Sequence, residues 1–214
     1  MGFSLSWIAS KGVDRAAMLE RLGLADAGEP EPAVPVPPPT KFAAFEQDGW
    51  LFVVSSSCGF ASRERIAAVS QSGAAVGAYL EEHVMVSGAF AASDGRLLWS
   101  AQHDPEFGEE HLDVWGEPPS VLPGIKAKLL AAQEDDPEVD FMFDVPTELA
   151  ATVCGFNPNS FDSEVDLVEL KVVRRDLLKM GDQPLASAMK DPGGRYPVDP
   201  PRKRGLLARL FGAR

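Results

Sequence analysis

The chain has 214 residues, 45% of them hydrophobic, and a formal net charge of −12 at pH 7. One core domain with additional segments is typical of this length and composition, and no apolar run approaches the ~18 residues that span a bilayer. The negative charge argues against nonspecific nucleic-acid binding, which depends on basic side chains that neutralise phosphates.

The cysteine content predicts a cytoplasmic protein. Cys58 and Cys154 are far apart and neither belongs to a CxxC pair, which is compatible with a reducing compartment. No basic segment followed by an apolar one marks a secretory signal. The nucleotide-binding patterns GxGxxG and GxxxxGK[ST] are absent, so we expect no cofactor.

The first ten residues, MGFSLSWIAS, fit two patterns. Phe3, Leu5 and Trp7 alternate, as the buried face of a β-strand does. Gly2 also begins an N-myristoylation pattern, but a single acyl chain holds a membrane only marginally. We favour the strand, with Trp7 at least partly buried.

A helix, a proline-rich segment and a hairpin follow this strand. Asp14 is placed to cap a helix that Gly23 ends. Residues 27–40 are rich in proline, which removes backbone donors, and they predict an extended excursion or linker outside the core. The dipeptide Asp-Gly at 48–49 predicts a tight turn between two strands.

The next segment combines a helix signal with strand alternation. Ser62 is placed to cap a short helix. Residues 73–87 alternate like one strand, and only Glu82 interrupts the apolar face of that strand.

A second hairpin is predicted at the Asp-Gly dipeptide 94–95. This turn would pair Ala92 with Leu97 and Phe90 with Trp99 across the two strands. The elements predicted after it are a strand at 111–115, helices at 119–135 and 145–156, and a strand at 164–173 followed by a short helix.

The predicted fold is α+β, with a mainly antiparallel sheet of five or more strands and helices mostly on one face. The first six elements follow the βαββαβ order of the ferredoxin-like fold, and the second hairpin extends the sheet. We expect one domain over residues 1–180 and an irregular to disordered C-terminal tail over residues 181–214.

Cys58 is the candidate nucleophile. It follows an apolar strand and precedes a helix, so the helix dipole and Arg63 or Arg65 could lower the pKa of its thiol. A phosphatase-type loop would need arginine at position 64, where the chain has glutamate. The alternative, which we favour, is a small buried residue.

Glu82 and His83 are the other catalytic candidates. An unpaired carboxylate on an apolar strand face is costly, so Glu82 should be either paired or functional. His83 could join His103 and Asp104 from a separate strand as metal ligands, although no HExxH pattern fixes their spacing. A solvated sheet face is the alternative, and we expect no metal.

An acidic stretch at residues 104–148 carries 13 carboxylates and 2 lysines. This excess predicts an electrostatic docking surface for a basic protein partner, and a solvated acidic face is the alternative. The residues expected to contact the partner are Glu109, Glu110, Asp113, Glu134, Asp135 and Asp136.

The last 13 residues, RKRGLLARLFGAR at 202–214, contain five bases and no acid. On a helix they would place apolar side chains on one side. Such a tail could bind an anionic membrane, fold back on the acidic body or stay disordered. Its defining residues are Arg202, Lys203, Arg204, Arg209, Leu206, Leu210 and Phe211.

The favoured function is a non-catalytic, cytoplasmic binding or inhibitor-type protein whose acidic surface contacts a basic protein partner. Immunity proteins that neutralise basic toxins have this physical profile. Two alternatives stay open: a peripheral membrane protein that uses residues 202–214, and an enzyme built on Cys58, Glu82 and histidines from separate elements.

Overall fold

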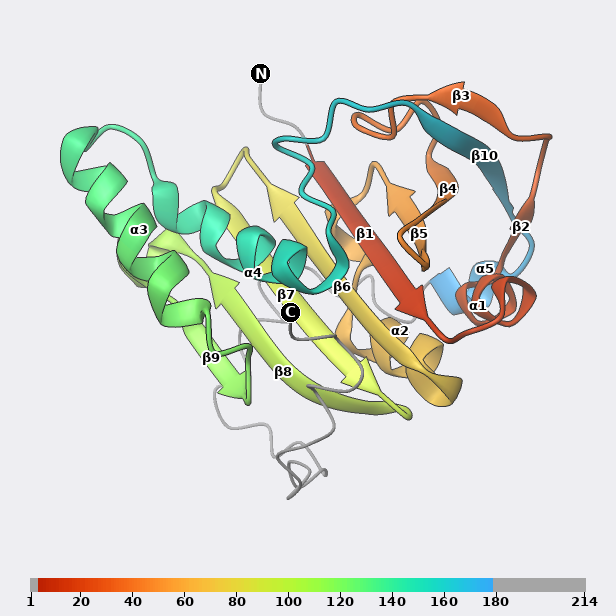
Figure 1. The fold of residues 1–214 in the computed structure, drawn as a ribbon, viewed down its shortest axis with the longest axis horizontal. Coiled ribbons are helices and arrows are strands. Elements are labelled where there is room, and N and C mark those ends of the chain that lie inside the picture. Colours follow the sequence, from red (N-terminus) through yellow and green to blue (C-terminus); the bar gives the residue numbers. More distant parts are fainter. Residues whose placement is uncertain (1–3, 179–214) are drawn as a thin grey trace.

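The computed structural model describes residues 4–178, which form a mixed α+β fold around an antiparallel sheet of ten strands (Figure 1). The strand order is β2-β10-β4-β5-β1-β6-β7-β8-β9, and β3 also pairs with β10. The predicted α+β class and mainly antiparallel sheet are confirmed. The strands are β1 Ser4–Lys11, β2 Leu24–Asp26, β3 Glu31–Ala33, β4 Phe42–Gln47, β5 Trp50–Ser55, β6 Ala74–Glu81, β7 Val86–Ser93, β8 Arg96–His103, β9 Asp113–Gly116 and β10 Val165–Val172.

Five α-helices lie along the described part of the chain, and they cover both faces of the sheet. α1 and α2 pack on the face that carries Ile8, and α3 and α4 pack on the face that carries Trp7. The prediction of helices mostly on one face is therefore wrong. Because every residue of β5 and β7 is buried, both faces need a cover. The helices are α1 Arg15–Leu22, α2 Arg63–Val69, α3 Leu122–Asp135, α4 Val145–Cys154 and α5 Arg175–Leu178.

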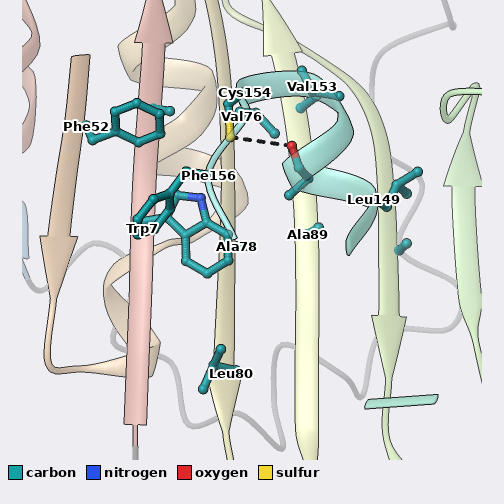
Figure 2. Close-up of a cluster of buried hydrophobic side chains, with 14 of the residues drawn as sticks. Trp7, Phe52, Val76, Ala78, Leu80, Ala89, Leu149, Val153, Cys154 and Phe156 are labelled. Atoms are coloured by element: carbon teal, nitrogen blue, oxygen red, sulfur yellow. Dashed lines mark hydrogen bonds between the residues drawn. The ribbon is translucent and has the colours of Figure 1, made fainter. Parts of the chain in front are cut away.

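The N-terminal strand lies in the middle of the sheet, between β5 and β6. Leu5 and Trp7 are fully buried in one core cluster, which confirms the predicted strand face for these two residues. Phe3 lies outside the described residues. The rings of Trp7 and Phe156, which follows α4, form a T-shaped pair at a centroid distance of 5.5 Å (Figure 2). The first strand is therefore a core element.

The predicted helix ends have the expected capping contacts. Asp14 Oδ1 accepts the backbone N–H of Ala17 at 3.1 Å, and Ser62 Oγ accepts that of Arg65 at 3.3 Å. Gly23 ends α1 with a φ of 72°, in the left-handed region where glycine has no steric cost. These predictions succeed because each depends on a few neighbouring residues.

The hairpin of β7 and β8 contains a β-bulge that shifts its register. Ala92 faces its predicted partner, but Phe90 pairs with Ser100, so the predicted Phe90–Trp99 pair is wrong. The extra residue is Leu98. Leu98 and Trp99 consequently both pack into the core on the α3/α4 side, which a regular strand would not allow.

Residues 73–87 form two strands, and the predicted single strand is wrong. β6 ends at Glu81, a turn occupies 82–85, and β7 begins at Val86. Val84 is 55% exposed in that turn, and Glu82 lies in the turn as well. Glu82 is therefore not on an apolar strand face. The turn contains neither glycine nor proline, so alternation runs through it without an interruption.

Part of the proline-rich segment joins the sheet. β3 lies within residues 27–40 and pairs with the first residues of β10, Val165–Leu167. Pro32 lies within β3, where the sheet has no further strand beyond it. The segment predicted as an excursion thus forms an edge of the sheet.

No helix among residues 4–178 has the length and apolarity needed to cross a membrane. The predicted irregular tail at 181–214, including the basic residues of 202–214, lies outside the described residues.

Candidate functional site

A polar cluster lies where β1, β6 and η1 meet. Cys58 opens the 3-10 helix η1 (Cys58–Phe60), and its backbone N–H donates to Ser4 Oγ at 3.0 Å. Nδ1 of His83 lies 2.5 Å from Oε1 of Glu81. Glu81 interacts with both Cys58 and His83, so we call Ser4, Cys58, Glu81 and His83 the Cys58 cluster.

The carboxylate in this cluster is Glu81, whereas the sequence pattern pointed to Glu82. Glu81 is the last residue of β6, and Glu82 follows it in the turn. Glu82 acts on Asp144 instead: burial raises the pKa of Asp144, and nearby carboxylates, including Glu82, raise it further. The structure therefore does not place Glu82 with the thiol.

The Cys58 thiol is held in its protonated form. Burial raises its pKa, the negative charge of Glu81 raises it further, and the hydrogen bond with Ser4 opposes both effects. Burial also acts to raise the pKa of Glu81, but hydrogen bonds with His83, Ser4 and Cys58 together lower it. Glu81 is thus ionised beside a neutral thiol, which is the reverse of what an activated cysteine nucleophile needs.

A second polar group lies on the same sheet face. Burial raises the pKa of Tyr79 to about 12, and its hydroxyl accepts a hydrogen bond from Gln102 Nε2 at 3.1 Å. Gln102 Oε1 in turn accepts from Arg63 Nη2 at 2.5 Å. The Tyr79 ring lies so close over Gly88 that a Cβ there would be 2.5 Å from it. These contacts hold Tyr79 as a neutral, structural side chain.

His103 joins the end of β8 to the connection between α3 and α4. The side chain is fully buried, with Nδ1 2.7 Å from the carbonyl oxygen of His111 and Nε2 2.9 Å from Asp140 Oδ2. Asp140 also accepts the N–H of Phe143 at the start of the 3-10 helix η4 (Phe141–Asp144). Both ring nitrogens are therefore occupied by protein oxygens.

The predicted metal candidates are engaged separately. His83 contacts Glu81 on the β6–β7 turn, His103 contacts Asp140, and Oδ1 of Asp104 accepts the N–H of Glu106 at 2.9 Å. Among residues 4–178, no group of three or more histidine, cysteine, aspartate or glutamate side chains is arranged to hold a metal ion.

The six predicted partner-contact residues are all exposed and come from elements at one edge of the sheet (Figure 1). Three lie in the β8–β9 connection and in β9, and three lie at the C-terminal end of α3. Lys126 Nζ, in the first half of α3, donates to the carbonyl oxygen of Glu110 at 3.5 Å, which joins the β8–β9 connection to this helix. We call these six residues, with the exposed apolar residues among them, the β9-edge surface. Those apolar residues are Phe107, Val114, Val121 and Val139.

Thiol alkylation tests the electrostatics of the Cys58 cluster. We expect Cys58 to react with iodoacetamide at pH 8 more slowly than a free thiol, and Glu81→Gln to speed the reaction by about 2- to 5-fold, because loss of the charge lowers the thiol pKa. Glu82→Gln is the matched control and should leave the rate unchanged. Mass spectrometry resolves the sites, and an equal effect of both substitutions would contradict the assignment of Glu81.

Comparison of the chain with protein family models, with curated proteins and with solved structures found no match. The chemistry of these residues is therefore inferred from their own contacts.

Proposed function

We propose that this chain is a non-catalytic, cytoplasmic binding or inhibitor-type protein that contacts a basic protein partner through the β9-edge surface. The observation that carries the proposal is the combination of exposed carboxylates with exposed apolar side chains. Four of the seven large hydrophobic residues that are exposed within residues 4–178 lie on this surface, between Phe107 and Val139. Apolar patches bordered by polar residues are typical of protein–protein contact sites.

The charges of this surface support the same function. No lysine or arginine within residues 4–178 forms an ion pair with any of its six carboxylates. Their negative potential is therefore available to attract a basic partner and to speed the association. Immunity proteins that neutralise basic toxins have this physical profile.

The edge position of β9 adds a third supporting feature. β9 ends the strand order and pairs only with β8 within the described part of the chain. It has four residues, and Val114 is 39% exposed on it. A partner segment could pair with this edge while its basic side chains meet the carboxylates around it.

We further propose that β1, α1, β4, β5, α2 and β6 are a ferredoxin-like unit. The spatial order β4-β5-β1-β6, with antiparallel neighbours throughout, supports it. Contact between α1 and α2 on one face supports it as well. In this interpretation the β9-edge surface belongs to the extension of the unit.

A binding experiment with matched charge variants tests the proposed function. The immobilised chain is exposed to a lysate of its source organism at low ionic strength. Each retained basic protein is purified and titrated against three forms. These forms are the wild type, the variant Glu109→Gln/Glu110→Gln/Asp113→Asn, and the control Glu20→Gln/Asp162→Asn/Glu169→Gln, which removes three exposed acids elsewhere.

We expect at least one basic protein to bind the wild type and the control with equal affinity. Its affinity for the β9-edge variant should be lower by about 10-fold or more, and high salt should abolish the binding. Equal binding to all three forms, or retention of no basic protein, would overturn the proposal.

A further inference from the structure

A cavity of about 990 Å³ lies at the opposite edge of the sheet from β9. Its walls are the start of α1, residues 26–32, the end of β4 and the first half of β10. β2 and β3 pair with different parts of β10, and the chain between them, Ala27–Pro30, spans the gap. The cavity is therefore a product of how the proline-rich segment pairs with β10.

The charge of this cavity is strongly negative. Five carboxylates line it, and Arg15 is the one basic residue of its lining. Arg15 lies 2.6 Å from Asp26 and 3.9 Å from Glu46. The other three carboxylates, Glu29, Glu164 and Asp166, form no ion pair with a lysine or arginine of residues 4–178.

The remaining walls of the cavity are apolar. They are formed by Pro30, Pro32, Phe45, Val165 and Val168. A concave site with apolar walls and several carboxylates suits arginine and lysine, because these side chains place an aliphatic stem on apolar surface and a charged group on oxygen acceptors.

We infer that this cavity binds the basic C-terminal segment of the same chain, residues 202–214. That segment carries five basic residues and no acidic one, and it includes leucine and phenylalanine side chains that match the apolar walls. The charge of the segment is therefore complementary to the charge of the cavity. This inference concerns a different surface from the one proposed to bind a partner.

The course of the chain allows this contact. The described residues end at Leu178 in α5, which follows β10 and contacts α1, the helix whose first residue lines the cavity. From there to Arg202 the chain has 202 − 178 = 24 residues, which span up to roughly 80 Å when extended. α1 itself is only about 12 Å long.

Zero-length coupling with a carbodiimide in the full-length chain tests the inference, because it joins an amine only to a carboxylate that it contacts. Lys203 is the lysine of the basic segment. We expect mass spectrometry to find Lys203 joined to Glu29, Glu164 or Asp166 of the same molecule, the three lining carboxylates that Arg15 does not pair with. The variant Lys203→Arg keeps the charge and should abolish these products, which checks their assignment.

Two charge variants locate the contact. Glu29→Gln/Glu164→Gln/Asp166→Asn should lower total Lys203 coupling at least 10-fold, whereas Glu109→Gln/Glu110→Gln/Asp113→Asn should leave it unchanged. Circular dichroism checks that both variants are folded. A second measurement needs no variant: the yield of Lys203 coupling in the wild type should also fall at about 0.5 M salt, which screens the charges.

Each other outcome overturns the inference. The first is the absence of any Lys203 product, and the second is preferential coupling of Lys203 to the β9-edge surface. The third comes from a mixture of ¹⁵N-labelled and unlabelled protein: products that join a labelled to an unlabelled chain would assign the segment to a second copy. The β9-edge variant serves here as the control, so failure of this inference and failure of the proposed function are distinguishable.

Discussion

Phe156→Ala is expected to lower the free energy of unfolding by about 3–5 kcal/mol. Phe156 follows α4 and is fully buried, and its ring contacts Trp7, Phe45, Phe52 and Phe161 at centroid distances of 5.1–5.5 Å. Alanine would remove all four ring contacts and leave a cavity beside Trp7 (Figure 2). Urea unfolding followed by circular dichroism measures the loss.

Two variants serve as controls for this experiment. Phe156→Leu keeps most of the buried volume and should cost clearly less than alanine. Phe107→Ala truncates a side chain that is 62% exposed and should change the unfolding free energy by no more than about 0.5 kcal/mol. If Phe156→Ala cost as little as Phe107→Ala, the packing described for the Phe156 ring would be wrong.

Asp140→Ala is expected to cost about 2–3 kcal/mol, because it leaves a ring nitrogen of the fully buried His103 without a partner. The carbonyl oxygen of His111 can only accept, so Nδ1 of His103 carries a hydrogen. Nε2 and Asp140 Oδ2 then share one proton between them, whichever atom holds it. Losing the carboxylate removes this contact and also the one with Phe143 N–H.

Asp136→Ala is the matched control for this variant. Asp136 is exposed in the same connection between α3 and η4, and its removal should cost no more than about 0.5 kcal/mol. A double-mutant cycle of Asp140→Ala with His103→Ala should give a coupling energy of at least about 1 kcal/mol in urea unfolding. Additive costs would contradict a direct contact between the two side chains.

Local features of the fold could be predicted from the sequence, because each depends on a few adjacent residues. The capping contact of Asp14 and the left-handed glycine that ends α1 are examples. The central place of β1 and the number of helices on each face depend on distant segments. One sequence signal does favour a cover on both faces: residues 50–54 of β5, WLFVV, are apolar without interruption, as in a strand buried on both sides.

The candidate site was less accessible to sequence analysis. The alternating pattern of residues 73–87 continues through the turn, so it predicted that Glu82 lies on an apolar strand face. The strand ends one residue earlier, at Glu81. Strand alternation by itself places Glu81 on the same face as Tyr79, and the end of β6 at Glu81 puts Glu82 in the turn. The partner of His103 lies 37 positions away at Asp140, and no local pattern connects the two.

The late position of β10 in the chain has a consequence for synthesis on the ribosome. β4 is complete at residue 47, but its second neighbour, β10, begins at residue 165. At about 5–20 residues per second, roughly 6–24 s pass between the two events. During that time the nascent β4 presents an open hydrogen-bonding edge with apolar side chains, which is the feature that promotes aggregation between chains. Addition of β10 ends this exposure, so shielding by chaperones matters most before residue 172 has emerged.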